Sequence, residues 1–222
     1  MDADVLTGGN PAVEAPPASR GGGPGFALAF AMAALLVVFF APLMICVALA
    51  IWVQDGGPPL FAHSRLGHGG RAFPCLKFRT MAVDAEARLQ RLLAEDLEAQ
   101  AEWARDHKLR RDPRVTPLGA ALRSSSLDEL PQLFNVLRGE MDLVGPRPIT
   151  AGEAVRYGSR LALYCSIRPG ITGLWQVSGR TDVSYRRRVA LDSLYARRKT
   201  LSLDLAILVL TLPAVLFRRG SY

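Results

Sequence analysis

The chain has 222 residues, of which 50% are hydrophobic, and a formal net charge of +7. This length allows one domain of ordinary size with appendages, and the basic balance suits nucleic acid, an anionic membrane or an anionic substrate as partner. The sequence contains no zinc-finger, P-loop or dinucleotide fingerprint, and its three widely separated cysteines (Cys46, Cys75 and Cys165) indicate reduced thiols rather than a disulfide framework.

The first 54 residues contain a tail and a membrane element. Residues 1–25 are rich in Gly, Pro and Ala and are predicted to be disordered, because they hold too little apolar surface to offset the entropy of ordering. Residues 26–54 are almost free of charge and, as a straight helix, would be about 42 Å long, enough to cross a hydrocarbon core of about 30 Å. Two interpretations stay open: a transmembrane helix kinked at Pro42, which hydropathy alone favours, or a re-entrant helix broken there.

A hairpin and a long helix are predicted next. Gly67 to Gly70 allow a hairpin-like turn before a short strand over Ala72–Met81, which carries Lys77 and Arg79. Leucines recur at helical spacing with charges between them over Asp84–His107. This pattern predicts an amphipathic packing helix without chemistry of its own.

Two adjacent carboxylates, Asp128 and Glu129, stand just before Pro131. Proline is tolerated in the first turn of a helix but not deeper, so a helix over residues 131–137 is expected to begin at residue 127 or 128. On spacing alone, ordinary capping is the commoner explanation of this pair. Ser126 followed three residues later by Glu129 forms a capping box, and acidic residues in a first turn complement the helix dipole.

Shorter elements flank the carboxylate pair. Thr116 and Pro117 predict the cap and first residue of a helix that ends near Arg123. The apolar C-terminal stretch, residues 201–217, is marginal as a membrane span and is predicted to form an interfacial helix. The other expected elements are a helix over residues 154–165, a strand over residues 174–177 and a helix capped by Asp182 that ends at Arg198.

Five motifs occur in one order along the chain. They are KFRTM (77–81), DPRVTPLG (112–119), SSSLDELPQLFNVLRGEMDLVGPRP (124–148), RPGITG (168–173) and WQVSGR (175–180). Together they resemble the bacterial sugar transferase family, the small monotopic phosphoglycosyl transferases, over roughly residues 26–222. The pattern is most similar to the exopolysaccharide-initiating undecaprenyl-phosphate galactose or glucose phosphotransferases.

The resemblance implies a mostly helical α+β fold attached to the cytoplasmic face of the bacterial inner membrane. It favours the re-entrant form of the N-terminal helix, although the family bends at a Ser-Pro pair where this sequence has Ala41-Pro42. The implied divisions are a disordered tail (1–25), a re-entrant membrane helix broken at Pro42 (26–54), a small cytosolic catalytic domain with short strands (55–200), and a C-terminal interfacial amphipathic helix and tail (201–222).

The resemblance also implies a reaction, in which a hexose 1-phosphate passes from a UDP-sugar to undecaprenyl phosphate through a phosphosugar-aspartyl intermediate. Asp128 would be the nucleophile, and Glu129 with Asp128 would hold Mg²⁺. The implied substrate-binding side chains are Lys77, Arg79, Arg123, Arg147 and Arg180. The partners would be the UDP-sugar, undecaprenyl phosphate and the lipid bilayer, with no nucleic acid, and the chain could form a homo-oligomer.

A non-enzymatic alternative stays open on charge and hydropathy alone. A basic, membrane-anchored module could bind anionic lipid or nucleic acid. Such a module gives no reason for an Asp-Glu pair beside Arg123. The two hypotheses differ in their prediction for Asp128→Ala, which abolishes UMP release only if the chain is the enzyme.

Overall fold

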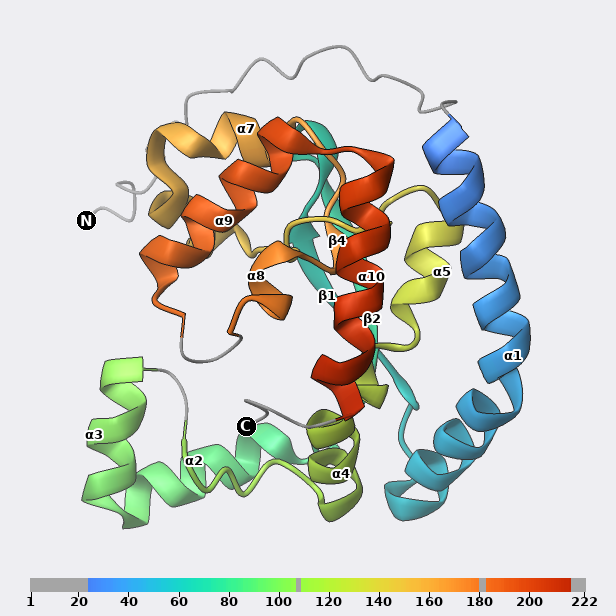
Figure 1. The fold of residues 1–222 in the computed structure, drawn as a ribbon. Helices are drawn as coiled ribbons and strands as arrows, with labels where there is room; N and C mark the ends of the chain where they lie inside the picture. The colour runs from blue at the N-terminus through green and yellow to red at the C-terminus, as the bar shows by residue number, and fades with distance from the viewer. Residues whose placement is uncertain (1–23, 107–108, 180–182, 217–222) are drawn as a thin grey trace, which may run out of the picture.

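The computed structural model describes residues 24–106, 109–179 and 183–216, and it has the mostly helical α+β architecture expected from the sequence. The long helix α1 (Pro24–Asp55) runs along one side of the molecule, and α10 (Leu201–Leu216) packs on the domain near it (Figure 1). The elements between them are β1 (Leu60–Leu66), η1 (His68–Gly70), β2 (Ala72–Phe78), α2 (Ala85–Glu95), α3 (Leu97–Asp106), α4 (Pro117–Ser125), η2 (Leu127–Glu129), α5 (Gln132–Leu137), β3 (Asp142–Val144), α6 (Ala151–Ala154), η3 (Val155–Arg160), α7 (Leu161–Cys165), β4 (Gly170–Thr172), α8 (Leu174–Val177) and α9 (Tyr185–Arg198). The tail predicted for residues 1–25 lies almost wholly outside the described residues.

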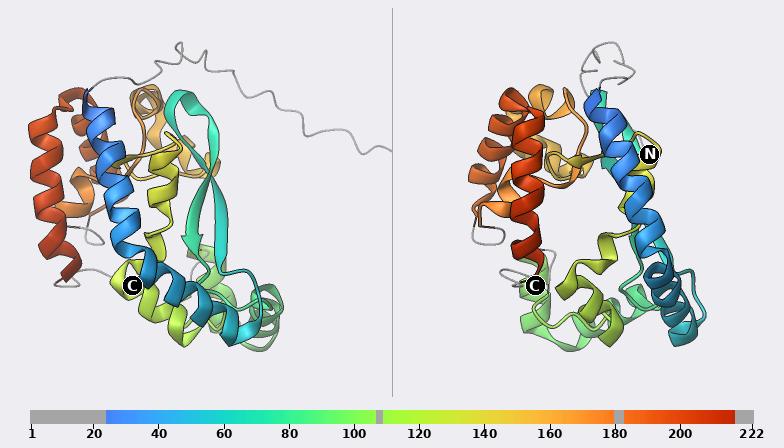
Figure 2. Two further views of the ribbon diagram at one scale, coloured as in Figure 1. Left: turned by 90° about the vertical axis from the view of Figure 1, so that its right-hand side faces the viewer. Right: turned by 45° about the vertical axis from the view of Figure 1, so that its right-hand side comes forward.

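Helix α1 is continuous through Pro42, so the expected break into two arms is wrong. Proline removes one hydrogen bond and crowds the preceding turn, but a helix can bend and continue past it. Figure 2 shows α1 bending along its length around the outside of the molecule. Large apolar side chains such as Val38 and Val53 are more than 70% exposed on it. Within the described ranges, α1 is the one helix long and apolar enough to cross a membrane, by length and composition.

Strands β1 and β2 form the hairpin that the glycine turn predicted. They pair antiparallel from Leu60 opposite Phe78 to Leu66 opposite Ala72. The turn is made possible by Gly69 and Gly70, whose φ angles of 67° and 71° favour glycine. β2 ends at Phe78, three residues before the expected end of the strand.

A second, two-stranded sheet pairs β3 with β4 in parallel. The pairing depends on Gly170, because a Cβ there would lie 2.0 Å from the backbone nitrogen of Gly145. The strand expected over residues 174–177 is wrong, since that segment is the short helix α8. A four-residue segment with three apolar side chains does not by itself distinguish the two structures, and β4 ends just before it.

Local capping explains the helices of the lower half of Figure 1. The single helix expected over residues 84–107 is two helices, because Asp96 adopts an extended backbone and its Oδ1 accepts hydrogen bonds from the first backbone amides of α3. Thr116 caps α4 as predicted, accepting from the Gly119 nitrogen at 2.9 Å. Helix α9 ends at Arg198 as expected but is capped by Ser184, and the expected cap Asp182 lies outside the described residues.

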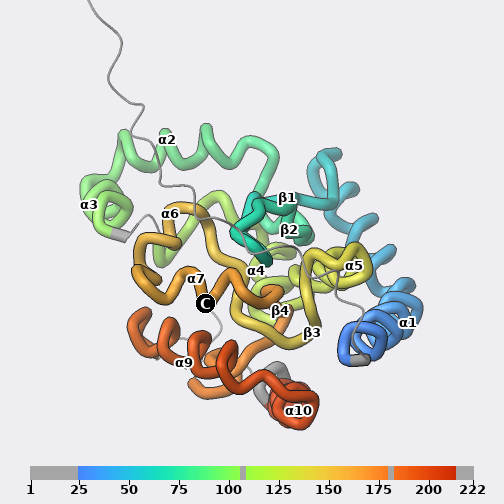
Figure 3. Tube along the Cα trace, turned by 90° about the horizontal axis from the view of Figure 1, so that it is seen from above, coloured from blue at the N-terminus to red at the C-terminus, as the bar shows by residue number. Residues whose placement is uncertain are grey.

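The main core joins α1 to the sheets. Its buried side chains include Ala33 of α1, Phe73 of β2, Val136 of α5 and Ile207 of α10. Seen from above in Figure 3, α5 and the paired strands lie between α1 on one side and α9 with α10 on another. Helix α1 packs on α5, the helix that follows the carboxylate pair, whereas α10 packs on α8, β3 and β4.

Candidate active site

Asp128 and Glu129 lie on a tight 3₁₀ turn, η2, between helices α4 and α5. Ser126 starts this turn in the left-handed conformation, with φ 59°, and its side chain makes no capping hydrogen bond. The capping-box interpretation is therefore wrong. A helical turn does begin at Leu127, as expected, but it is the 3₁₀ turn η2, and α5 itself begins at Gln132. The left-handed residue reverses the chain after α4, so that both carboxylates face β2 rather than the first turn of α5.

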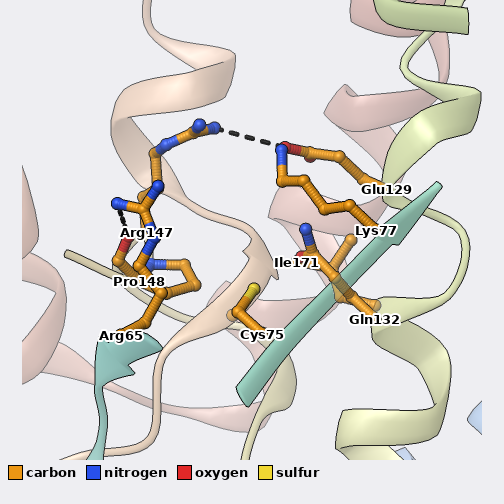
Figure 4. Close-up of a pocket in the computed structure, with 9 residues that line it drawn as sticks. Arg65, Cys75, Lys77, Glu129, Gln132, Arg147, Pro148 and Ile171 are labelled. Atoms are coloured by element: carbon orange, nitrogen blue, oxygen red, sulfur yellow. Dashed lines mark hydrogen bonds and ion pairs between the residues drawn. The ribbon is translucent and has the colours of Figure 1, made fainter. Parts of the chain in front are cut away.

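Lys77 on β2 joins the two carboxylates. Its Nζ lies 2.6 Å from Glu129 Oε1 and 3.5 Å from Asp128 Oδ2. Arg147, which follows β3, approaches Glu129 Oε1 to 3.4 Å from the other side (Figure 4). All four side chains are at most 35% exposed. The structure thus brings together four of the site residues expected from the motifs.

A buried amide holds β2 against α5 beneath these ion pairs. Asn135 is 0% exposed, and its Oδ1 accepts a hydrogen bond from the Leu76 backbone at 3.0 Å. Its Nδ2 donates to the Pro74 carbonyl at 2.8 Å and to Glu140 Oε2 at 2.6 Å. Because Leu76 directly precedes Lys77, the hydrogen bond to this amide fixes the position of the Lys77 backbone relative to the carboxylate turn.

The two carboxylates differ in acidity. Burial raises the pKa of Asp128, the negative charge of Glu129 raises it further, and Lys77 and Arg123 oppose the shift without cancelling it. Burial also acts to raise the pKa of Glu129, but Arg147, Lys77 and Arg65 outweigh it and the pKa is lowered. Glu129 is therefore the permanently charged member, while Asp128 is the more basic carboxylate and, once ionised, the better nucleophile.

The other expected arginines are distributed differently. Arg123 donates from Nε to Thr80 Oγ1 at 2.8 Å and is close enough for its charge to lower the pKa of Asp128. Arg79 instead forms an ion pair with Asp55 at the end of α1, away from the carboxylate turn. Arg180 lies outside the described residues.

Residues that the sequence analysis did not select as site residues also line this small pocket, among them Arg65, Cys75 and Gln132. Arg65 on β1 donates to the Pro148 carbonyl at 3.4 Å (Figure 4). It also donates to Glu153 Oε2 at 3.2 Å. Residues 61, 63 and 65 pair with residues 77, 75 and 73, and directly paired residues share a face of the hairpin. Side chains alternate between the two faces of a strand, so Arg65 lies on the same face of the hairpin as Lys77. Applying this alternation to the predicted hairpin would have found Arg65.

The pocket is closed by its own ion pairs. Its volume of about 10 Å³ holds roughly one water molecule. An anionic ligand would have to take over Lys77 and Arg147 from Glu129, since both cations contact the same carboxylate oxygen, Oε1. The arrangement can bind phosphate oxygens by exchanging one anionic partner for another.

The donor set fits a magnesium ion that shares its coordination with substrate. No group of three or more His, Cys, Asp or Glu side chains that could hold a metal occurs in the described ranges. Magnesium is often bound by only one or two carboxylates together with water and substrate phosphates. Asp128 and Glu129 provide two carboxylates on one turn, and the lysine and arginine contacts of Glu129 leave Oε2 for a cation.

A second cavity of about 240 Å³ lies between the start of α1 and the start of α10. Its walls are mostly apolar, with Phe26, Met32 and Leu205 among the lining residues. Asp142 forms ion pairs with Lys199, at 2.6 Å, and with Arg168, at 4.0 Å, at its polar edge. The cavity shares no lining residue with the carboxylate pocket.

The structure is that of an α+β domain with one long apolar helix and a carboxylate pair between cations. Comparison with known proteins identifies the family. The family model described as bacterial sugar transferase matches residues 26–218. The chain therefore belongs to the bacterial sugar transferase family, which confirms the family and the transferase class expected from the motifs.

Named relatives are similar over most of this chain. The undecaprenyl-phosphate galactose phosphotransferase of Salmonella typhimurium is 50% identical over 85% of this chain and 39% of its own length. The exopolysaccharide production protein ExoY of Rhizobium meliloti is 47% identical over 86% of this chain and 84% of its own length. The UDP-glucose:undecaprenyl-phosphate glucose-1-phosphate transferase of Caulobacter vibrioides is 42% identical over 86% of this chain and 68% of its own length. The chain thus spans about two-fifths of the Salmonella protein and most of ExoY.

Proposed function

We propose that this protein transfers a hexose 1-phosphate, of galactose or glucose, from a UDP-sugar to undecaprenyl phosphate and so initiates a surface polysaccharide. The names of the relatives support the sugar and the lipid acceptor. The observation that carries the proposal is the approach of Lys77 and Arg147 to the Asp128-Glu129 turn, where Lys77, Glu129 and Arg147 line one pocket. A binding module for lipid or nucleic acid has no need of this arrangement.

Electrostatics explains why the pocket has this composition. A carboxylate that attacks a diphosphate brings like charges together, at a cost of about 4 kcal/mol for one pair at 4 Å and an effective dielectric of 20. Lys77, Arg147 and Arg65 supply fixed positive charge on three different elements around the carboxylates. When bound by Asp128 and Glu129, Mg²⁺ would neutralise further charge on the diphosphate oxygens.

The proposed chemistry has two displacements at one phosphorus. An Asp128 carboxylate oxygen attacks the phosphorus that bears the sugar, the bond to the UMP oxygen breaks, and UMP leaves with the electron pair. A phosphate oxygen of undecaprenyl phosphate then attacks the same phosphorus and releases the Asp128 carboxylate. The raised pKa of Asp128, which comes first from burial, makes this carboxylate the stronger nucleophile. The acyl phosphate that it forms is a mixed anhydride, so the carboxylate can leave again when the acceptor attacks.

The membrane helix explains how a lipid-bound acceptor reaches this pocket. α1 packs on α5, the helix that directly follows the carboxylate turn, and presents an exposed apolar surface outward. We propose that α1 enters and leaves the inner membrane by its cytoplasmic face, with the bend near its middle in place of a full break. The domain is then held at the surface, where the headgroup of the acceptor meets it.

The decisive experiment supplies the full-length protein with UDP-glucose or UDP-galactose and Mg²⁺ but no acceptor. The proposal requires about one UMP per active site and a hexose-phosphate mass adduct on Asp128. Asp128→Ala removes both signals. UMP that forms only after acceptor is added, without an adduct, would replace the covalent step by direct displacement, and no UMP under either condition would reject the transferase function.

A further inference from the structure

Buried polar atoms without hydrogen-bond partners gather in one place outside the carboxylate pocket. Eight such side-chain atoms occur in the described part of the chain, two on Arg79 and six on a cluster from α8 and α9. The six atoms are Trp175 Nε1, Gln176 Oε1, Tyr185 Oη, Arg188 Nε, Arg188 Nη2 and Asp192 Oδ1. Because an unpaired buried polar group costs free energy, folded proteins leave few of them, and such a concentration calls for a ligand.

The cluster is held rigidly by contacts that do not use these atoms. The Arg188 guanidinium stacks over two rings, 4.7 Å from the centre of Trp175 and 5.3 Å from the centre of Tyr185. Asp192, only 2% exposed, accepts a 2.7 Å hydrogen bond from Tyr157 on Oδ2 and leaves Oδ1 unpaired. The stacking leaves the guanidinium edge formed by Nε and Nη2 for two acceptor atoms, which is the edge that binds paired oxygens.

Two contacts connect this cluster to the wall of the carboxylate pocket. Gln176 Nε2 donates to the Ile171 carbonyl at 3.0 Å, and Ile171 lines the pocket. On the other side, Arg188 is close enough to Glu153 to lower its pKa, although burial opposes the shift, and Glu153 accepts from Arg65 of the pocket at 3.2 Å. The cluster therefore adjoins the wall of the pocket that Lys77, Glu129 and Arg147 line.

The chemistry of the set selects a hydroxyl-rich ring. Trp175 and Arg188 can only donate, Gln176 Oε1 can only accept, and the Tyr185 hydroxyl can do both. A purely anionic ligand would satisfy the donors but leave Gln176 Oε1 and Asp192 Oδ1 unpaired. Vicinal hydroxyl groups satisfy both kinds, because each hydroxyl donates one hydrogen bond and accepts up to two.

We infer that the α8–α9 cluster, Trp175, Gln176, Tyr185, Arg188 and Asp192, binds the hexose ring of the sugar-nucleotide donor. The inference rests on the proposed function for the identity of the donor. It adds a sugar site beside the phosphate-binding pocket and assigns sugar recognition to a part of the chain outside the carboxylate turn.

Single-atom variants test the inference, because the deleted groups have no partner in the fold. Trp175→Phe removes the indole N–H, and Tyr185→Phe removes the hydroxyl, while both keep the stacked rings. In an Asp128→Asn background, which does not consume donor, calorimetry would compare the binding of UDP with that of UDP-glucose and UDP-galactose. We expect each variant to weaken UDP-hexose about 3- to 10-fold while UDP binding stays the same.

A matched control separates binding from folding. Tyr195→Phe also removes a buried hydroxyl, but one that donates to the Val144 carbonyl and Asp204. It should lower the melting temperature by several degrees and leave the hexose contribution intact, whereas the cluster variants should melt within roughly 1 °C of the parent or above it. Equal weakening of UDP and UDP-hexose, or no weakening of either, would overturn the inference. If the cluster variants lose hexose affinity but the protein with Asp128 intact releases no UMP, the transfer reaction is rejected and the sugar site is still supported.

Discussion

Lys77 Nζ lies 2.6 Å from Glu129 Oε1, although the two residues are separated by 52 positions in the sequence. The contact joins the end of the hairpin to the carboxylate turn. In the proposed reaction Lys77 has two tasks: it holds the carboxylates in the resting site, and it receives phosphate oxygens when the donor binds.

Lys77→Met should lower the rate of UMP release by about 10²-fold, the usual cost of losing one group that stabilises developing negative charge. It should also move the acidic limb of the rate profile to higher pH. Lys77 lowers the pKa of Asp128, which burial has already raised, so its removal lets Asp128 hold its proton to higher pH. Pre-steady-state UMP release between pH 5 and pH 9 measures both effects.

Lys77→Arg is the matched control for this variant, because it keeps the positive charge while changing its shape. The acidic limb should stay near that of the wild type, and the rate should fall less than in Lys77→Met. An acidic limb that is unchanged in Lys77→Met would mean that the ion pair observed here does not control the ionisation of Asp128.

Asn135→Ala should lower the free energy of unfolding by about 3 kcal/mol, since it leaves the Leu76 N–H and the Pro74 carbonyl without their partner in a buried place. UMP release should fall with it at temperatures where the variant stays folded, because β2 loses its attachment to α5. Urea unfolding and single-turnover assays at one temperature measure the two quantities. A less stable variant with normal UMP release would show that Lys77 is positioned without this amide.

Local signals in the sequence predicted the elements that local interactions determine. Thr116 and Pro117 specify the start of α4, and four residues with three glycines specify the hairpin turn. The strand predicted at residues 174–177 was wrong, because a four-residue segment with three apolar side chains fits either a strand or a helix. The helix break at Asp96 was missed because aspartate inside a charged amphipathic pattern does not reveal that its side chain caps the next helix.

The site residues that belong to the family motifs could be predicted from the sequence. Their final positions could not be predicted where tertiary packing determines them. The motifs gave Lys77, Asp128, Glu129 and Arg147, which the structure brings together. They also gave Arg79, which would share a face with Lys77 in a longer strand. β2 ends at Phe78, and the chain beyond it turns Arg79 toward α1.

Asp192→Asn should remove a pH-dependent loss of folding stability. Burial raises the pKa of Asp192 from 3.8 to about 6, so the folded state favours the protonated acid. The contribution of Asp192 to the stability of the wild type is then greatest below pH 4 and falls by about 3 kcal/mol as the pH rises through 6. The asparagine variant lacks this fall, so it should be the more stable protein at pH 8 and lose that advantage by pH 4.

Chemical unfolding at pH 4, 6 and 8 measures this difference. Asp84→Asn is the control, because it makes the same chemical change at a side chain that is 60% exposed. A difference between Asp192→Asn and wild type that does not change with pH would mean that Asp192 is ionised in the folded protein throughout this range.

Arg79→Gln and Asp55→Asn should have the same effect, because each removes one side of the ion pair between Arg79, which follows β2, and Asp55 at the end of α1. Asp55 also accepts from the Gly57 and Val83 backbones, and Gly57 leaves room for the guanidinium, since a Cβ there would lie 2.2 Å from Arg79 Nη1. We expect each variant to lower stability in detergent by about 1 kcal/mol and the double variant to lower it little further, as for two partners in one interaction. The KM for the UDP-sugar should be unchanged in all three proteins. A KM that rises tenfold in Arg79→Gln alone would instead place Arg79 among the donor-binding residues, as the motif suggested.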